Sequence, residues 1–186
     1  MVLVRQNKFN FQISKAELLA LLLYVKGPKG NIAEEIVGKT RLMKFMFLLL
    51  KEANLEKYLS EESSFEAYKY GPFDIEIYDI LDALEELDVI EVRSKMTIES
   101  LEIENENISD LISEIEETYD ASTIFKLTEY GKEKTIEIYN EVPEDILRKI
   151  ENIKIIWSKK PLIQLLHYVY TKYPDYAKMS EANIYD

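Results

Sequence analysis

Residues 40–53, with the sequence TRLMKFMFLLLKEA, constrain the fold more than any other part of the chain. Read as a helix, this stretch is apolar nearly all round, and such a helix is stable only when other elements cover it on every side. Thr40 is expected to cap the start of the helix, because a threonine hydroxyl can accept from the free N–H groups there. We therefore expect a central buried helix surrounded by the rest of the chain.

Amphipathic stretches elsewhere in the chain can supply that cover. Ser14 followed by Glu17 is the pattern of a capping box, and the apolar run behind it predicts a first helix. A short helical turn is expected at 32–37. Three further helices are predicted, one after Thr128, one at 143–156 and one at 161–173.

Residues 65–92 read as a strand, a Gly-Pro turn, a helix and a second strand. Gly71 and Pro72 close the first strand, and Pro72 suits the first position of a helix, where a missing N–H costs nothing. The apolar residues expected on the inward face of this helix are Phe73, Ile77, Ile80, Leu81, Leu84 and Leu87. The second strand, at 89–93, has its expected partner at 123–128.

Between these two strands lies a long acidic stretch, which we interpret as an insertion at about 94–123. Its residues Ile108, Leu111, Ile112 and Ile115 have helical spacing and predict one short amphipathic helix. The predicted fold class is mostly α with a small β wing. We expect a winged-helix-like domain over 1–141, and additional C-terminal helices over 142–186 that pack on the same core.

Charge is distributed unevenly along the chain, whose net charge is −12. Residues 1–51 carry 9 basic and 3 acidic side chains, whereas 52–120 carry 4 basic and 22 acidic ones. Residues 121–186 are balanced, with 10 of each. Blocks of this kind typically mark a solvated face or an interaction surface.

Several classes of function lack the residues that they need. The chain has no cysteine and one histidine, His167, so it cannot build an ordinary zinc site or a cysteine nucleophile. The VGKT stretch ending at Thr40 lacks the glycine and the strand of a phosphate loop. We therefore expect no catalytic residue, no metal and no cofactor, and thus no enzyme. The absence of cysteine and of a membrane-length apolar run predicts a cytoplasmic protein.

The predicted helix after Pro72 would expose a row of carboxylates. Its outward residues are Glu76, Asp79, Asp82 and Glu86. Such a row attracts a basic protein partner and repels phosphate. Basic residues that could instead contact nucleic acid lie earlier in the chain, and they are Lys26, Lys29, Lys39, Arg41 and Lys44.

Two stretches together, KTRLMKFMFLL at 39–49 and FEAYKYGPFDIEIYDIL at 65–81, resemble the pattern of Panacea-type domains, also described as SocA-like antitoxin or phage-associated proteins. The matching positions are Leu42, Lys44, Phe45, Tyr68, Tyr70, Gly71, Pro72, Phe73 and Tyr78. Thr128 and Gly131 fall in the Leu-Thr-x-x-Gly frame that follows a winged-helix wing. Phe45 stands where leucine is usual, and both the acidic insertion and the chain beyond residue 143 depart from the pattern.

The resemblance implies a non-enzymatic, winged-helix-like module that acts by binding a protein, as antitoxin or adaptor domains do. Its partner would be a toxin or another basic protein, docked on the acidic helix. The alternative is a winged-helix DNA-binding transcription regulator that uses the basic N-terminal region. The apolar surplus of the two C-terminal helices has two explanations of equal weight: they close the core, or they form a homodimer.

Overall fold

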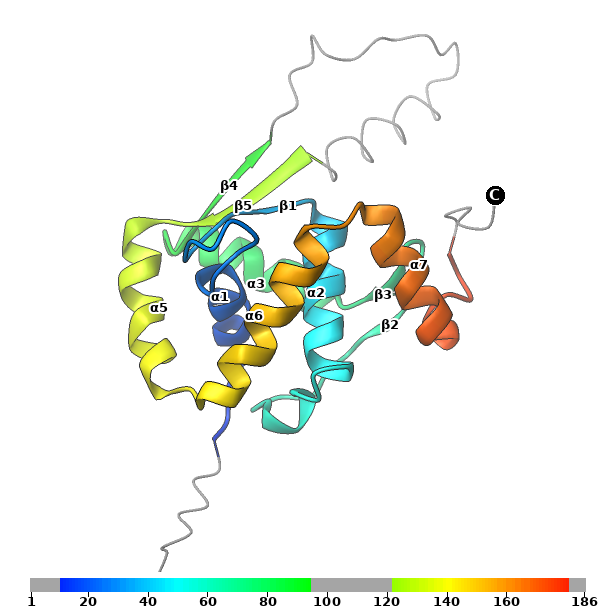
Figure 1. The fold of residues 1–186 in the computed structure, drawn as a ribbon, viewed down its shortest axis with the longest axis horizontal. Coiled ribbons are helices and arrows are strands. Elements are labelled where there is room, and N and C mark those ends of the chain that lie inside the picture. Colours follow the sequence, from blue (N-terminus) through cyan, green and yellow to red (C-terminus); the bar gives the residue numbers. More distant parts are fainter. Residues whose placement is uncertain (1–10, 95–121, 181–186) are drawn as a thin grey trace, which may run out of the picture.

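The chain is mostly helical and carries a small antiparallel sheet, as the computed structural model in Figure 1 shows. The structure describes residues 11–94 and 122–180. Its α-helices there are α1 (Lys15–Tyr24), α2 (Lys39–Lys51), α3 (Ile75–Glu86), α5 (Glu129–Glu141), α6 (Glu144–Ser158) and α7 (Leu162–Lys172). Its strands are β1 (Ile36–Val37), β2 (Glu66–Tyr68), β3 (Gly71–Phe73), β4 (Ile90–Ser94) and β5 (Thr123–Leu127). Two short 3-10 helices, at Glu56–Tyr58 and Pro174–Tyr176, complete these elements.

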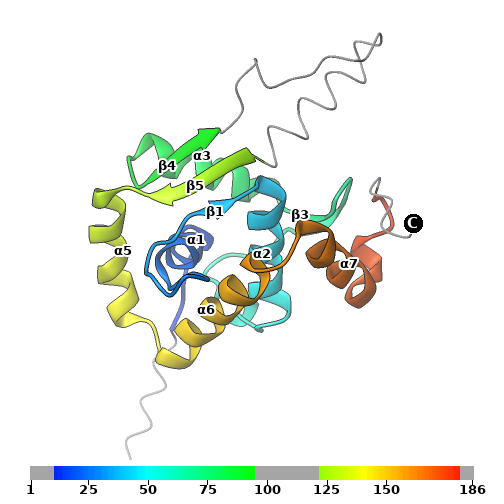
Figure 2. The same ribbon diagram turned by 45° about the horizontal axis from the view of Figure 1, so that its top comes forward.

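The central helix is α2, as its sequence predicts. Every residue from Leu42 to Leu50 is buried, and α2 lies among α1, α6 and α7 in both views (Figures 1 and 2). Thr40 was expected to cap this helix, and that expectation is wrong. Gly38, with φ +95°, occupies the cap position, and its N–H donates to Thr123 O at 2.7 Å. The start of α2 is thereby attached to β5.

The sheet has the strand order β1-β5-β4, with both pairs antiparallel. The predicted pairing of the strands near 89–93 and 123–128 is confirmed, with Val92 opposite Phe125. The helical turn expected at 32–37 is wrong, because Ile36 and Val37 pair with β5 instead. Ile36 is buried, so this short β-branched pair completes the sheet and covers the core.

A separate hairpin joins α2 to α3. In it β2 pairs with β3, and Tyr68 lies opposite Gly71. Pro72 was expected at the first position of the helix, but it lies inside β3 and α3 begins three residues later. The pairing of Gly71 with Tyr68 prolongs the hairpin beyond the turn, and Asp74 provides the actual cap.

The C-terminal helices close the same core as the N-terminal ones. Trp157 of α6 and Val169 of α7 are buried in one apolar cluster with Leu19 of α1 and Phe47 of α2. The predicted helices at 143–156 and 161–173 are confirmed as α6 and α7. The apolar side chains that suggested a homodimer are largely used inside the chain, so they no longer argue for one.

Two further sequence expectations concern the insertion and the membrane. The segment 95–121, with the amphipathic helix expected around Ile108, lies outside the described residues. Within 11–94 and 122–180, no helix is both long and apolar enough to cross a bilayer.

Candidate partner-binding surface

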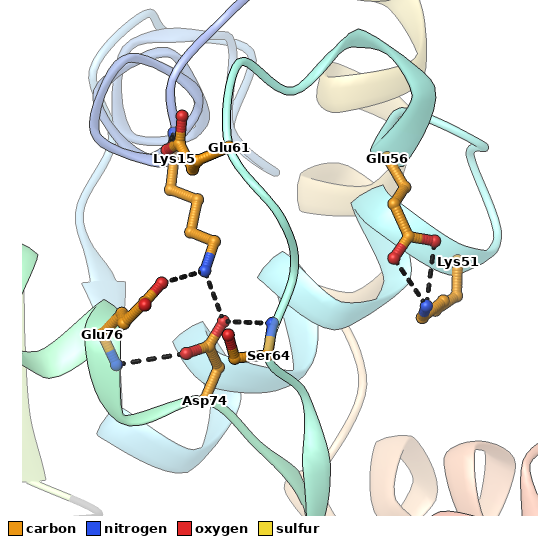
Figure 3. A network of polar contacts seen from close by, with 7 residues as sticks. All are labelled: Lys15, Lys51, Glu56, Glu61, Ser64, Asp74 and Glu76. Carbon is orange, nitrogen blue, oxygen red and sulfur yellow. Dashed lines mark hydrogen bonds and ion pairs between the residues drawn. The ribbon is translucent and has the colours of Figure 1, made fainter.

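A buried ion pair fixes the start of α3 in place. Lys15 Nζ donates to Asp74 Oδ2 at 2.9 Å, and their side chains are 1% and 0% exposed. Asp74 also caps α3 by accepting from Glu76 N at 3.1 Å, and Lys15 forms a second ion pair with the Glu76 carboxylate (Figure 3). Burial would lower the pKa of Lys15, but the two carboxylates outweigh it and the pKa is raised.

The inner face of α3 is narrower than its sequence suggests. Ile77 and Leu81 are buried, while Ile80 and Leu84 are half-buried. Leu87 was expected on this face but is 65% exposed, because the helix ends before it and the chain turns away at Asp88. Phe73 was also expected there, yet it belongs to β3.

The outer face of α3 carries a row of free carboxylates. Asp79, Asp82 and Glu86 are all exposed, and within the described part of the chain no hydrogen bond or ion pair engages them. At about 100° per residue these three lie along one stripe that starts at Ile75, itself 57% exposed. We call these four residues the α3 stripe.

Glu76 differs from the other three carboxylates of the predicted row. Its side chain is 52% exposed, yet it lies to one side of the α3 stripe and pairs with Lys15. Glu76 was predicted to belong to the same row as the other three carboxylates, because spacing alone does not show which carboxylate has a buried partner. Ile75 was overlooked as an exposed apolar residue because its neighbours Ile77 and Ile80 turn inward.

Acidic residues continue beyond the end of α3 around a shallow hollow of about 430 Å³. Glu85 contributes from the last turn of α3, Asp88 from the turn after it, Glu91 from β4 and Glu129 from the start of α5. Among the described residues that line the hollow, Lys126 is the one cation. Glu91 and Glu129 form ion pairs with Arg93 and Lys132, so within the described residues the unpaired negative charge here comes from Glu85 and Asp88. Glu85, Asp88 and Glu129 were not singled out from the sequence, because only the fold brings them together.

The basic residues proposed for nucleic-acid contact do not form one surface. Lys44 is 2% exposed and donates to Pro72 O at 2.9 Å, so its assignment as a phosphate contact is corrected to a structural one. Arg41 donates to Trp157 O at 2.6 Å and to Lys160 O at 3.0 Å, at the end of α6. Lys39 lies 5.6 Å from the ring centroid of Tyr78. Lys26 and Lys29 are exposed on the loop after α1.

The hairpin residues of the Panacea-like pattern have structural roles. Gly71 has φ +83°, and a Cβ there would lie 2.5 Å from the Tyr170 ring of α7. The Tyr68 and Phe73 rings stack at 4.9 Å between centroids, and Tyr78 meets Phe73 edge-on at 5.3 Å. Tyr70 occupies the turn of the hairpin, between Tyr68 and Gly71.

The other pattern residues hold the sheet against the helices. Leu42 is fully buried in α2. Thr128 caps α5 as predicted, accepting from Gly131 N at 2.9 Å, and its hydroxyl donates to Asp88 O at 2.5 Å. Gly131 packs so tightly on the residue before β4 that a Cβ would lie 1.9 Å from Val89 O. Over the described residues, no cluster of His, Asp or Glu has the arrangement of a metal site.

Comparison with known proteins assigns this chain to no group. No family model, curated protein or solved structure matches it.

Proposed function

We propose that this chain is a non-enzymatic protein-binding module with a winged-helix-like fold, and that it docks a basic protein on α3. The observation that carries the proposal is the α3 stripe, whose exposed carboxylates have no partner in the described chain. A row of free negative charges steers and selects a positively charged partner, although each single surface ion pair contributes only about 0–1 kcal/mol. Ile75 adds an apolar contact at the end of the row.

The order of the elements supports the winged-helix-like part of the proposal. Among the described elements the order runs α1, β1, α2, α3, β4 and β5, with the 3-10 helix at Glu56–Tyr58 and the β2–β3 hairpin between α2 and α3. Strands β1 and β4 flank β5 in one sheet. The proposal assigns α3 to the position of the recognition helix and β4–β5 to that of the wing. The Panacea-type resemblance, with its antitoxin or adaptor role, agrees with the same arrangement.

DNA binding is the alternative that this topology raises. It is less well supported, because α3 has no Lys or Arg and would meet the duplex with like charge. Lys44 and Arg41 already donate to backbone carbonyls. That leaves Lys26, Lys29 and Lys39 for DNA contact.

The test replaces Asp79, Asp82 and Glu86 together by Lys and leaves Glu76 and its buried partner intact. The control makes the same charge change on α5, at the exposed residues Glu133, Glu137 and Glu141. Each protein is immobilised, and the polypeptides that it captures from a lysate of the host are quantified across a salt series. We expect a basic polypeptide on the wild type and the control that is lost from the α3 variant.

Duplex DNA is titrated in parallel by fluorescence anisotropy. The proposal expects weak, salt-sensitive binding by the wild type and no loss in the α3 variant. Equal capture of the same polypeptides by the α3 variant would exclude docking on α3. Tight duplex binding by the wild type would favour the alternative.

A further inference from the structure

A shallow apolar groove of about 550 Å³ lies at the end of α6, along the outer face of α7. Its floor is the aromatic pair of Trp157 and Tyr168, whose ring centroids are 4.6 Å apart. Ile163, which is 52% exposed, and His167 line one side of it. This face of α7 is not used in closing the core, which engages Leu165 and Val169 on the opposite side of the helix.

The groove is bordered by positive charge. Lys160 Nζ lies 5.3 Å from the ring centroid of Trp157, and Lys172 Nζ lies 5.2 Å from that of Tyr168. Glu52 is the nearby carboxylate, and it pairs with Lys172 at 3.1 Å. Residues 152–174 contain no Asp or Glu, in a chain that has 35 of them. The groove therefore fits a ligand that is both apolar and negatively charged.

One segment of the chain itself has this chemistry. Residues 95–121 carry nine acidic side chains and one basic one. Within them, Ile108, Leu111, Ile112 and Ile115 recur at the spacing of one helix face, so the sequence combines an apolar stripe with acidic flanks.

The ends of this segment emerge close to the groove. Ser94 pairs with Thr123, so both ends of the segment leave from the same end of the β4–β5 pair. Thr123 O accepts from Gly38 N at the start of α2, and Arg41, one helical turn on, donates to Trp157 O and Lys160 O. Figures 1 and 2 both show this end of β5 beside the start of α2, next to the α6–α7 junction. Half of the segment reaches at most ~45 Å at about 3.3 Å per residue, which is ample for this span.

We propose that residues 108–117 dock their apolar stripe into the groove on α6 and α7 of the same chain, with their carboxylates toward Lys160 and Lys172. The groove is thus a receptor site for an acidic amphipathic segment. It lies on different elements from the α3 stripe, and the two proposals stand or fall separately.

The absence of cysteine from the chain allows a direct test with the full-length protein. Thr171 lines the groove and is exposed, so Thr171→Cys places a single thiol there. In this Thr171→Cys protein, Leu111→Asn and Ile115→Asn are introduced together to interrupt the apolar stripe. The rate at which a maleimide labels the thiol is then measured with and without these two substitutions. Ser109→Asn with Ser113→Asn is the matched control, because it also places two Asn in the segment but leaves the stripe intact.

We expect severalfold faster labelling in the Leu111/Ile115 variant and in Ile163→Asn, and an unchanged rate in the Ser109/Ser113 control. High salt should also speed labelling of the parent protein, because it screens the charges on both sides. Equal rates in all variants would overturn the proposal. The proposal would also be overturned if the thiol were protected from the maleimide only at concentrations where light scattering gives a dimer mass. The segment in the groove would then belong to a second copy of the chain.

Discussion

Lys15 and Asp74 form a buried ion pair of 2.9 Å although they lie 59 residues apart in the chain. The first residue begins α1 and the second caps α3, so one contact fixes how the two helices start relative to each other. Glu61 accepts from the backbone N–H of Lys15 at 2.5 Å, which adds the loop before β2 to the same junction (Figure 3). The orientation of the α3 stripe therefore depends on this pair.

The first prediction is that Asp74→Ala destabilises the chain by about 3–5 kcal/mol, because it removes the fully buried one of the two carboxylate partners of Lys15 and also removes a helix cap. Glu56→Ala is the control, since it breaks the more exposed Lys51–Glu56 pair and should cost less than about 1 kcal/mol. Urea denaturation at pH 7 gives both free energies of unfolding. Similar values for the two variants would show that the buried pair has no special weight.

The second prediction concerns the contact between α5 and Val89, the residue before β4. A Cβ on Gly131 would lie 1.9 Å from Val89 O, and this carbonyl cannot move aside cheaply because it accepts from Thr128 N at 3.1 Å. Gly131→Ala should therefore cost about 3 kcal/mol or more, beyond the usual range for overpacking. Gly30→Ala is the control, because that site has φ +88° but open space, so only the backbone strain of about 1–2 kcal/mol applies. Thermal unfolding of both variants distinguishes the two costs.

The third prediction concerns Gly71, the first residue of β3 after the hairpin turn. Gly71→Val should be severe, because it combines a positive φ with a clash against the Tyr170 ring. Pro72→Ala should be mild, since the carbonyl that accepts from Lys44 stays in place. If both substitutions lowered the melting temperature equally, the conformation of Gly71 and its contact with Tyr170 would have no special weight in the hairpin.

Local patterns in the sequence predicted the elements well where the physics is local. The capping box of Ser14 and Glu17 and the cap at Thr128 need only residues three positions apart, and both are present. The all-round apolar character of residues 42–50 likewise required a central helix. The start of α3 was misplaced because a proline favours a helix start by its own geometry, whereas the β2–β3 pairing is a contact between segments.

The candidate site was less predictable because it depends on partners far apart in the chain. The carboxylates at 79, 82 and 86 could be placed outward from periodicity alone. Periodicity could not predict the separate role of Glu76 or the burial of Lys44. Their partners, Lys15 for Glu76 and Pro72 O for Lys44, come from other elements. Lysine side chains in helices are ordinarily exposed, so a buried lysine can be recognised only once the group that accepts its hydrogen bonds is known.

Lys154 is another such lysine, and it gives the fourth prediction. It is fully buried and donates to Leu23 O at 2.8 Å and Val25 O at 3.0 Å, at the C-terminal end of α1. Burial lowers its pKa from 10.5 to about 7, against the smaller opposing effect of Glu34 and Glu151. A folded pKa below the unfolded one means that the unfolded chain binds more protons between these two pH values.

The contribution of Lys154 to the free energy of unfolding should therefore rise with pH from about 7 to 10.5, by at most about 1.4 kcal/mol per pH unit. The measurement is urea denaturation at pH 7, 8, 9 and 10 of the wild type and of Lys154→Met, which lacks this titration. Subtracting the two removes the titrations that they share, and the difference should grow in favour of the wild type as pH rises. Lys159→Met, at an exposed position at the end of the same helix, controls for the loss of one lysine. A difference that stays constant across this range would mean that Lys154 keeps its proton in the folded chain, with the carbonyls of α1 stabilising the buried charge.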